Sequence, residues 1–253
     1  IEQVIVGLDL AVGAAQTDAQ IAQLVQGNLA AQVQIVTKAV RGKVGDGHIG
    51  GIAGALNYAS VERVLCPVTG YTTKAFNNFV KAVQKHGSSI TVPSVGDRFT
   101  VGSASCRVLG VNSTDDTNES SIVLHITYGH TSFMFTGDAE QEAENLIMSR
   151  GFDLKSDVLK VGHHGSASST SYRWLREVDP DYAVISVGSD NSYGHPHDEI
   201  VDRYTDAGVP MFRTDELGTI LIVSDGHELS VTWENQYAAP DAVEPAEDSS
   251  VTY

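Results

Sequence analysis

The sequence predicts an α/β fold, because short apolar runs rich in β-branched residues alternate with amphipathic helical segments along most of the chain. Three of the apolar runs lead, directly or through a short loop, into glycine and then an acidic or histidine side chain, at Gly137-Asp138, Gly162-His163-His164 and Gly194-His195. With 253 residues, the chain is long enough to bury a full hydrophobic core.

The predicted elements follow one another regularly after a less informative start. Residues 1–47 contain no aromatic residue, proline or histidine, and we expect there only a helix over 20–29 and a strand over 32–40. Further helices are expected over 52–60, 73–86, 139–150, 171–178 and 196–207. Strands are expected over 61–66, 90–92, 99–101, 106–111, 121–128, 132–136, 158–161, 181–187, 209–213, 219–223 and 228–233.

Local features justify these elements. The helix over 73–86 is followed by Gly87, a typical C-cap, and is apolar on one face through Phe76, Phe79, Val80 and Val83. Gly129 and His130 form the turn of a hairpin, so His130 is interpreted as a turn residue rather than a metal ligand.

The most informative stretch is 156–166, where an apolar strand runs straight into His163 and His164, with a glycine on either side. Glycine lets the backbone turn at the end of a strand, so the two imidazoles are expected at the rim of a sheet. The strand over 132–136 ends in a similar way, on Asp138. Binding and catalytic residues gather at such rims, which favours a shared site.

Each of these residues also has a purely structural interpretation. Asp138 begins the series Asp-Ala-Glu-Gln, whose spacing suits a helix N-cap. His195 precedes Pro196 at the start of a helix, so it either shapes that loop or acts as an acid–base group. Because metal-binding or acid–base side chains follow three strands rather than one, we favour the functional interpretation.

The charge and cysteine content restrict the function. Lys and Arg number 16 against 32 Asp and Glu, giving a formal net charge of −16, which disfavours nucleic acid as a partner. No apolar run approaches the ~20 residues of a membrane helix. Cys66 and Cys106 lie in strand-like segments, and we expect both thiols to be buried and unbridged.

Several separated motifs together resemble one family, the competence-type (DNA-uptake) branch of the metallo-β-lactamase-fold hydrolases. In chain order they are Asn118 with Ser121, Phe-Thr-Gly-Asp138, Leu-Lys-Val-Gly-His-His-Gly-Ser166, Ile-Ser-Val-Gly188 and Asn-Ser-Tyr-Gly-His-Pro196. The resemblance runs from about His48 to Trp233. It implies a four-layered αββα sandwich over residues 1–234. Residues 235–253 contain four acidic residues, two prolines and no basic residue, and this composition predicts an acidic flexible tail or linker.

The resemblance also implies a site. It implies zinc or manganese, as one or two ions, with metal ligands at His48, Asp138 and His164. It further implies catalytic roles for Asp138, His163 and His195, and places beside the metals or the substrate for Asn118, Ser121 and Ser166. A metal-activated water would then attack a phosphorus or carbonyl centre.

Residues 43–48 depart from the family's His-x-His-x-Asp-His motif. His48 matches the last histidine, but Lys43 and Gly45 stand at the earlier histidine positions and Gly47 at the aspartate position. Three donors remain from the three motifs. Because catalytic zinc sites commonly use three protein ligands, we predict at most one tightly held metal ion per chain.

Two hypotheses follow. The first is a metal-dependent hydrolase, of phosphodiesterase or nuclease type, acting on a phosphodiester or other ester. The alternative is a catalytically degenerate member of the fold that serves as a surface or binding module. The family resemblance implies an extracellular or cell-surface location, although no charged-then-apolar signal peptide is visible from Ile1 onward.

Overall fold

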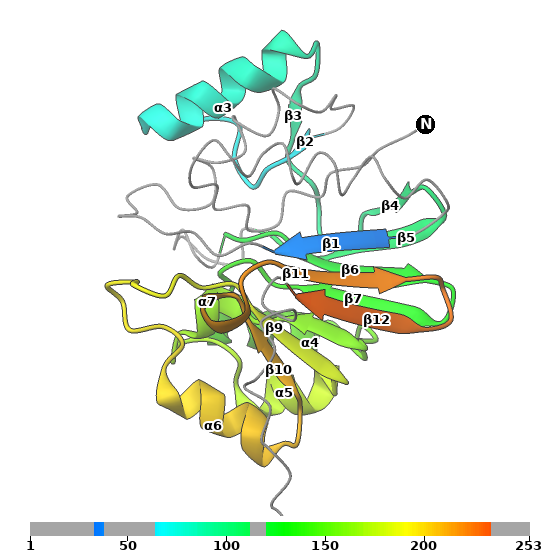
Figure 1. The fold of residues 1–253 in the computed structure, drawn as a ribbon. Helices are drawn as coiled ribbons and strands as arrows, with labels where there is room; N and C mark the ends of the chain where they lie inside the picture. Colours follow the sequence, from blue (N-terminus) through cyan, green and yellow to red (C-terminus); the bar gives the residue numbers. More distant parts are fainter. Residues whose placement is uncertain (1–32, 38–63, 112–119, 234–253) are drawn as a thin grey trace, which may run out of the picture.

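The computed structural model describes residues 33–37, 64–111 and 120–233, and its centre is a mixed sheet of seven strands (Figure 1). Their order is β10-β9-β8-β7-β6-β5-β4. Strands β7 to β10 run parallel, whereas β4 to β7 are antiparallel. The strands are β4 (Arg98–Val101), β5 (Ala104–Gly110), β6 (Val123–Tyr128), β7 (Thr131–Phe135), β8 (Val158–Lys160), β9 (Tyr182–Ile185) and β10 (Met211–Arg213).

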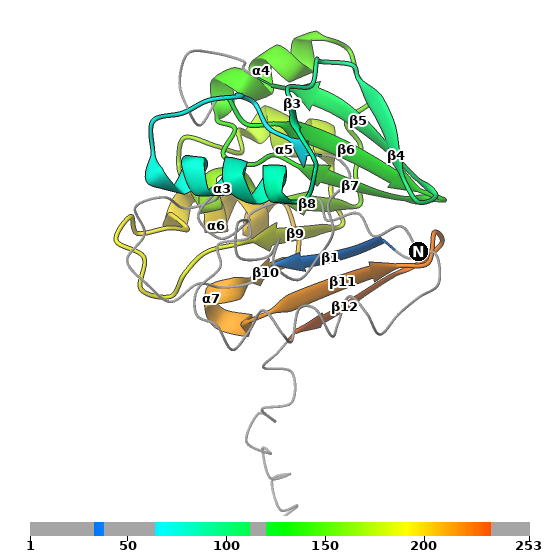
Figure 2. The same ribbon diagram turned by 90° about the horizontal axis from the view of Figure 1, so that it is seen from above.

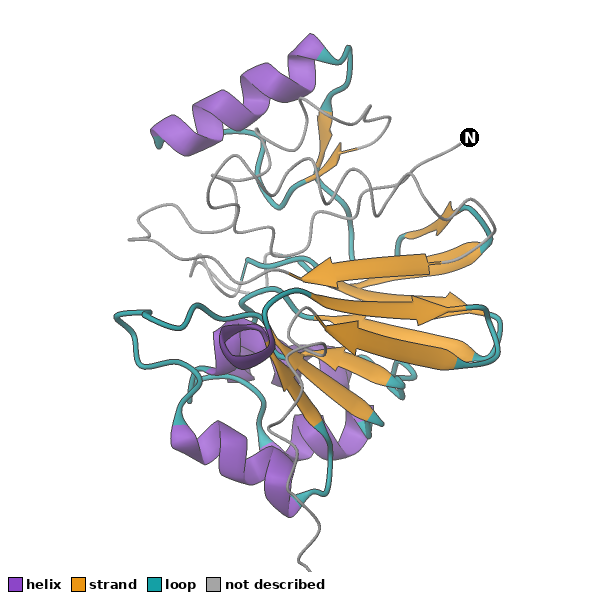
Figure 3. Ribbon diagram, in the orientation of Figure 1, coloured by secondary structure: helices purple, strands orange, loops and turns teal. Residues whose placement is uncertain are grey.

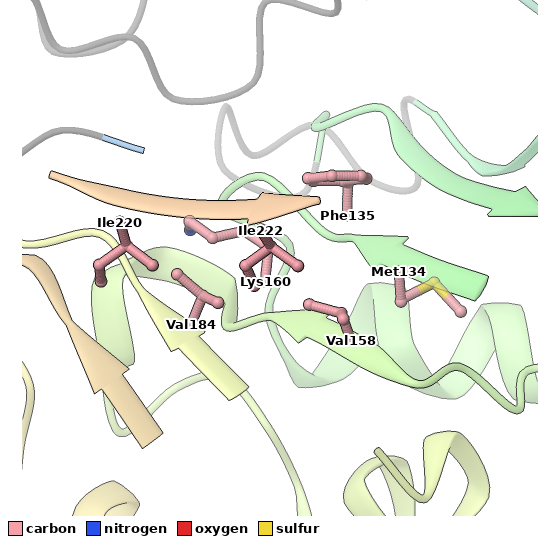
Figure 4. Close-up of a pocket in the computed structure, with 7 residues that line it drawn as sticks. All are labelled: Met134, Phe135, Val158, Lys160, Val184, Ile220 and Ile222. Atoms are coloured by element: carbon pink, nitrogen blue, oxygen red, sulfur yellow. The ribbon is translucent and has the colours of Figure 1, made fainter. Parts of the chain in front are cut away.

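A second, antiparallel sheet packs on one face of the first. It has the order β1-β11-β12, with β1 (Val33–Thr37), β11 (Ile220–Ser224) and β12 (Leu229–Trp233). Figure 4 shows Ile220 and Ile222 pointing from β11 toward Val158, Lys160 and Val184 of the central sheet, around an apolar pocket between the sheets. None of the predicted site residues lines this pocket, which is part of the core.

Three helices cover the other face of the central sheet, as Figure 3 shows. They are α4 (Gln141–Ser149), α5 (Tyr172–Val178) and α6 (Asp198–Asp206). Alternation along the strands separates the two cores, because Leu159 faces these helices while its neighbour Val158 faces the second sheet. The large helix side chains that are fully buried in this layer include Ile147, Trp174, Ile200 and Tyr204.

A smaller unit lies at the opposite end of the molecule from α6 in Figure 1, so in the view from above in Figure 2 its helix lies in front of α6. It consists of α3 (Lys74–Lys85) and the parallel pair β2 (Val64–Leu65) and β3 (Ile90–Thr91). Thr73 caps α3, because its Oγ1 accepts the backbone N–H of Phe76 at 3.2 Å. This smaller unit has an apolar cluster of its own, which includes Cys66, Phe79 and Val83.

The predicted α/β sandwich is confirmed, with three local differences. Helix α4 begins at Gln141, and its N-cap is Glu140, so Asp138 does not cap it and that structural interpretation is wrong. Helix α6 begins two residues later than predicted, and the short helix α7 (Thr214–Leu217) was not predicted. Both cysteines are free and buried, as expected. The helices predicted over 20–29 and 52–60 and the tail over 235–253 lie outside the described residues.

Within the ranges that the structure describes, no helix has both the length and the apolar character needed to cross a bilayer.

The contact between the two sheets should contribute strongly to stability. Ile222 is 1% exposed and lies between the sheets. Truncating it removes buried apolar surface and leaves a cavity, so we expect Ile222→Ala to lower the free energy of unfolding by about 2–4 kcal/mol in urea denaturation. The control is Leu146→Ala on α4, because this leucine is 36% exposed. Equal losses for the two variants would contradict this packing.

Candidate functional site

Parallel strands bring the site residues to one edge of the central sheet. Strands β7, β8 and β9 run side by side in the same direction, so their carboxyl ends meet. Asp138 follows β7, His163 and His164 follow β8, and Ser186 follows β9 directly. Residues that are far apart in the sequence therefore lie together at this edge, which is where open parallel sheets commonly bind their ligands.

The turn after β7 fixes the backbone of Asp138. The Asp138 N–H donates to Ser121 Oγ at 2.9 Å. Gly137 has φ +56°, and a Cβ at this position would lie 2.9 Å from the Ser121 side chain. Glycine is therefore required there both by conformation and by space. Ser121 thus positions Asp138 through its backbone.

The two histidines lie in a strained turn, residues Gly162–Gly165. Both adopt left-handed backbone conformations, with φ 44° at His163 and φ 54° at His164. Such conformations are uncommon outside glycine and persist only when the surrounding structure holds them. The His163 N–H donates to Gly137 O at 3.1 Å, which ties this turn to the one that carries Asp138.

His164 and Asp138 have the arrangement of two ligands of one cation. His164 Nδ1 is 2.7 Å from the Ser186 carbonyl oxygen, to which it donates, so in the neutral ring Nε2 carries the lone pair. This Nε2 lies 3.4 Å from Asp138 Oδ1. Two ligand atoms at about 2.0–2.2 Å from a tetrahedral zinc are also separated by about 3.4 Å. The two side chains are 28% and 14% exposed, so the pair lies at a partly open rim.

His163 turns toward a different carboxylate. Its Nδ1 lies 2.8 Å from Glu140 Oε1, with both side chains about three-quarters buried. A carboxylate bonded to one ring nitrogen orients the imidazole and fixes which nitrogen carries the proton in the neutral ring. His163 thus has the support of a proton-transfer group rather than the Asp138 contact that His164 has. Glu140 was not predicted as a site residue.

His195 joins the cluster from the loop after β9. Its ring centroid lies 5.4 Å from that of His163 and 6.4 Å from that of His164. Burial, together with the neighbouring histidines, lowers the pKa of His195 to about 4. At neutral pH His195 is therefore an uncharged imidazole, able to donate or accept one hydrogen bond without adding positive charge.

The loop that carries His195 is held against the histidine turn. His197 Nδ1 accepts the N–H of Ala167 at 2.9 Å, and the His197 N–H donates to Gly165 O at 3.0 Å. Pro196 packs so closely on Gly165, which has φ +82°, that an added Cβ would lie 2.6 Å from it. His197 was not predicted, because only the fold reveals that it contacts residues 30 positions earlier.

Two buried charged side chains, Glu144 and Arg203, hold the segment that follows the two histidines. Glu144 of α4 accepts the backbone N–H groups of Thr170 and Ser171, and Arg203 of α6 donates to the Thr170 carbonyl. Glu144 and Arg203 are only 2% and 8% exposed. Thr170 has φ 50°, so this clamp maintains another left-handed residue. In the sequence, the only sign of this clamp is that Glu144 lies on the apolar face of the predicted helix over 139–150.

The structure thus brings Asp138, His163, His164 and His195 together, with Ser121 behind Asp138. Ser166 is buried in the loop, where its hydroxyl lies 2.9 Å from that of Ser168. The other predicted residues, His48 and Asn118, lie outside the described ranges. Among side chains within those ranges, no group of three or more His, Cys, Asp or Glu is arranged to hold an ion. Of the predicted metal ligands, the described residues include two, His164 and Asp138, whose facing atoms are spaced like two ligands of one cation.

Comparison with known proteins identifies the class. The two-sheet sandwich with histidine and aspartate at the carboxyl edge of its parallel strands is that of a metal-dependent hydrolase domain. The profile of the Metallo-beta-lactamase superfamily matches residues 47–189, more than half of the chain, and the chain belongs to this superfamily.

Its relatives lie in the competence branch. The chain is 33% identical over 175 residues to ComE operon protein 3 of Bacillus subtilis, and the aligned region covers 68% of this chain and 23% of that protein. It is 38% identical over 106 residues to competence protein ComA of Neisseria gonorrhoeae, covering 42% and 15%. It is 44% identical over 86 residues to recombination protein 2 of Haemophilus influenzae, covering 34% and 11%. The matched region is thus less than a quarter of each relative's length.

The clamp on Thr170 should be important for stability. Replacing Glu144 with glutamine keeps the shape but removes the charge of the carboxylate that accepts the N–H groups of Thr170 and Ser171. We expect Glu144→Gln to lower the free energy of unfolding by about 1.5–3 kcal/mol, measured by denaturant titration. Glu228→Gln, at the exposed β11–β12 turn, makes the same chemical change and should alter it by less than about 0.5 kcal/mol. A Glu144 variant as stable as the Glu228 variant would show that the clamp contributes nothing.

Proposed function

We propose that this domain is a metal-dependent phosphodiesterase of the nuclease type. The observation that carries the proposal is the His164–Asp138 pair, whose facing Nε2 and Oδ1 atoms are 3.4 Å apart. Membership of the superfamily supports a metal-dependent hydrolase in general. The competence and recombination proteins among the relatives support a nucleic-acid phosphodiester as the bond that is cleaved.

We assign each residue of the site a role from its surroundings. His164 and Asp138 would hold a divalent cation, which when bound lowers the pKa of water and offsets charge on phosphoryl oxygens. His163, supported by Glu140, transfers the proton to or from the reacting oxygen. His195 stays neutral and donates a hydrogen bond to the phosphate, because its lowered pKa removes it as an acid at neutral pH.

A second candidate function rests on the loop at 43–48. Because this loop lacks most of the family's ligands, the domain would be a binding module that keeps the fold without catalysis. The two proposed functions predict different metal contents and different rates of hydrolysis. Both quantities can be measured on the same purified protein.

The first test measures the role of Asp138. Asp138→Asn keeps the shape but removes the carboxylate charge, so we expect hydrolysis of bis(p-nitrophenyl) phosphate with added zinc or manganese to fall about 100-fold or more. Thermal unfolding without metal should be unchanged. Asp206→Asn, an exposed aspartate on α6, is the charge-matched control and should retain full turnover. Equal turnover of the Asp138 variant and the wild type would exclude the metal mechanism, and no turnover by either would favour the binding module.

The second test counts metal ions. We expect calorimetric titration of the metal-free protein to show one tight zinc site per chain at most, because residues 43–47 lack the donors for a second. His164→Asn should weaken that site at least tenfold, whereas His227→Asn, an exposed histidine at the β11–β12 turn, should not. Two tight sites per wild-type chain would contradict the proposed ligand set.

A further inference from the structure

Three aromatic rings run nearly parallel from the surface to the metal-ligand pair. Tyr193 is 66% exposed, and its ring lies 5.7 Å from that of His195 with an interplanar angle of 23°. The His195 ring in turn makes an angle of 19° with His164, at 6.4 Å between centroids. Tyr193 is thus the outer member of a series whose inner member lies beside Asp138.

The loop that presents Tyr193 is held in place. Asn191 Nδ2 donates to Gly188 O at 2.9 Å and to His195 O at 2.7 Å, and its Oδ1 accepts the His195 N–H at 2.9 Å. These bonds close the loop on both sides of Tyr193. The backbone that carries the exposed ring is therefore held before any ligand binds, which lowers the entropy lost when a planar ligand stacks on the ring.

We propose that the outer face of Tyr193 is a stacking subsite for a nucleobase next to the scissile phosphodiester, so that the substrate is a single-stranded oligonucleotide. The inference rests on the proposed phosphodiesterase function and deepens it. Bases stack on aromatic side chains whatever their sequence, because every base has a π face. A duplex hides these faces, so a base must be unpaired to reach this ring.

The charge of the chain supports stacking over phosphate contacts. A protein of net charge −16 repels a long polyanion, so affinity must come from short-range contacts close to the site. Stacking is such a contact and does not depend on counterion release. Salt also screens the repulsion between the acidic protein and the strand, so we expect oligonucleotide affinity not to fall as the salt concentration rises.

The test measures binding apart from turnover. A short phosphorothioate oligonucleotide carrying 2-aminopurine, which resists hydrolysis, is titrated by fluorescence into wild-type protein in the presence of zinc, and a matched abasic strand competes with it. Loss of one base stack corresponds to roughly a 5- to 150-fold loss of affinity. We expect Tyr193→Ala to weaken binding of the base-containing strand about tenfold and to leave the abasic strand unaffected. Tyr193→Phe should bind like the wild type.

Two further variants separate stacking from other roles. Tyr193→Leu keeps an apolar side chain but lacks a π face, so it should behave like the alanine variant. Tyr172→Ala removes an equally exposed tyrosine, 67% exposed on α5, and should bind like the wild type. Thermal midpoints of all variants check that the fold is retained. Wild-type affinity in the alanine or leucine variant, or no oligonucleotide binding by the wild type, would overturn the inference.

The outcomes also distinguish the two proposals. Binding that depends on Tyr193, without hydrolysis when zinc or manganese is added, would support the stacking subsite and refute the phosphodiesterase. Hydrolysis with the same KM in the wild type and the Tyr193→Ala variant would support the phosphodiesterase and refute the subsite.

Discussion

The hydrogen bond from His164 Nδ1 to the Ser186 carbonyl is the constraint on which the site depends. It joins the end of β8 to the end of β9, and it orients the ring so that Nε2 faces Asp138 after the end of β7. Three adjacent strands must therefore keep their register for the pair to form. The two packed cores on either face of the central sheet provide this rigidity.

The site combines a strained backbone with a close histidine–carboxylate pair. Two consecutive histidines adopt left-handed conformations, and His164 Nε2 lies 3.4 Å from Asp138 Oδ1. In a chain of net charge −16, the carboxylates of Asp138 and Glu140 would also repel an anionic substrate. A divalent cation between His164 and Asp138 would reverse that local charge. The acidic composition and a phosphodiester substrate are then compatible.

Much of the fold could be predicted because it depends on local patterns. Alternating apolar residues marked the strands, and glycine after a strand marked the turns that carry Asp138 and the two histidines. The roles of Glu144, Arg203 and His197 were not predictable in the same way. Each contacts backbone groups 26 to 34 residues away in the sequence, so its role depends on how helices and loops pack. Helix α4 begins two residues later than the sequence predicted. Residues 136–140 form the turn after β7, in which Glu140 contacts His163, instead of a first helical turn.

The clamp formed by Glu144 and Arg203 also affects how the site can move. Glu144 belongs to α4, Arg203 belongs to α6, and both hold the peptide groups around Thr170, six residues after His164. Freeing this segment would break charge-assisted bonds to two helices packed in the main core. Local opening of the segment is therefore as costly as loosening the helix layer itself. Its amide protons at Thr170 and Ser171 should exchange with solvent as slowly as those of the buried strands, although they lie in a loop.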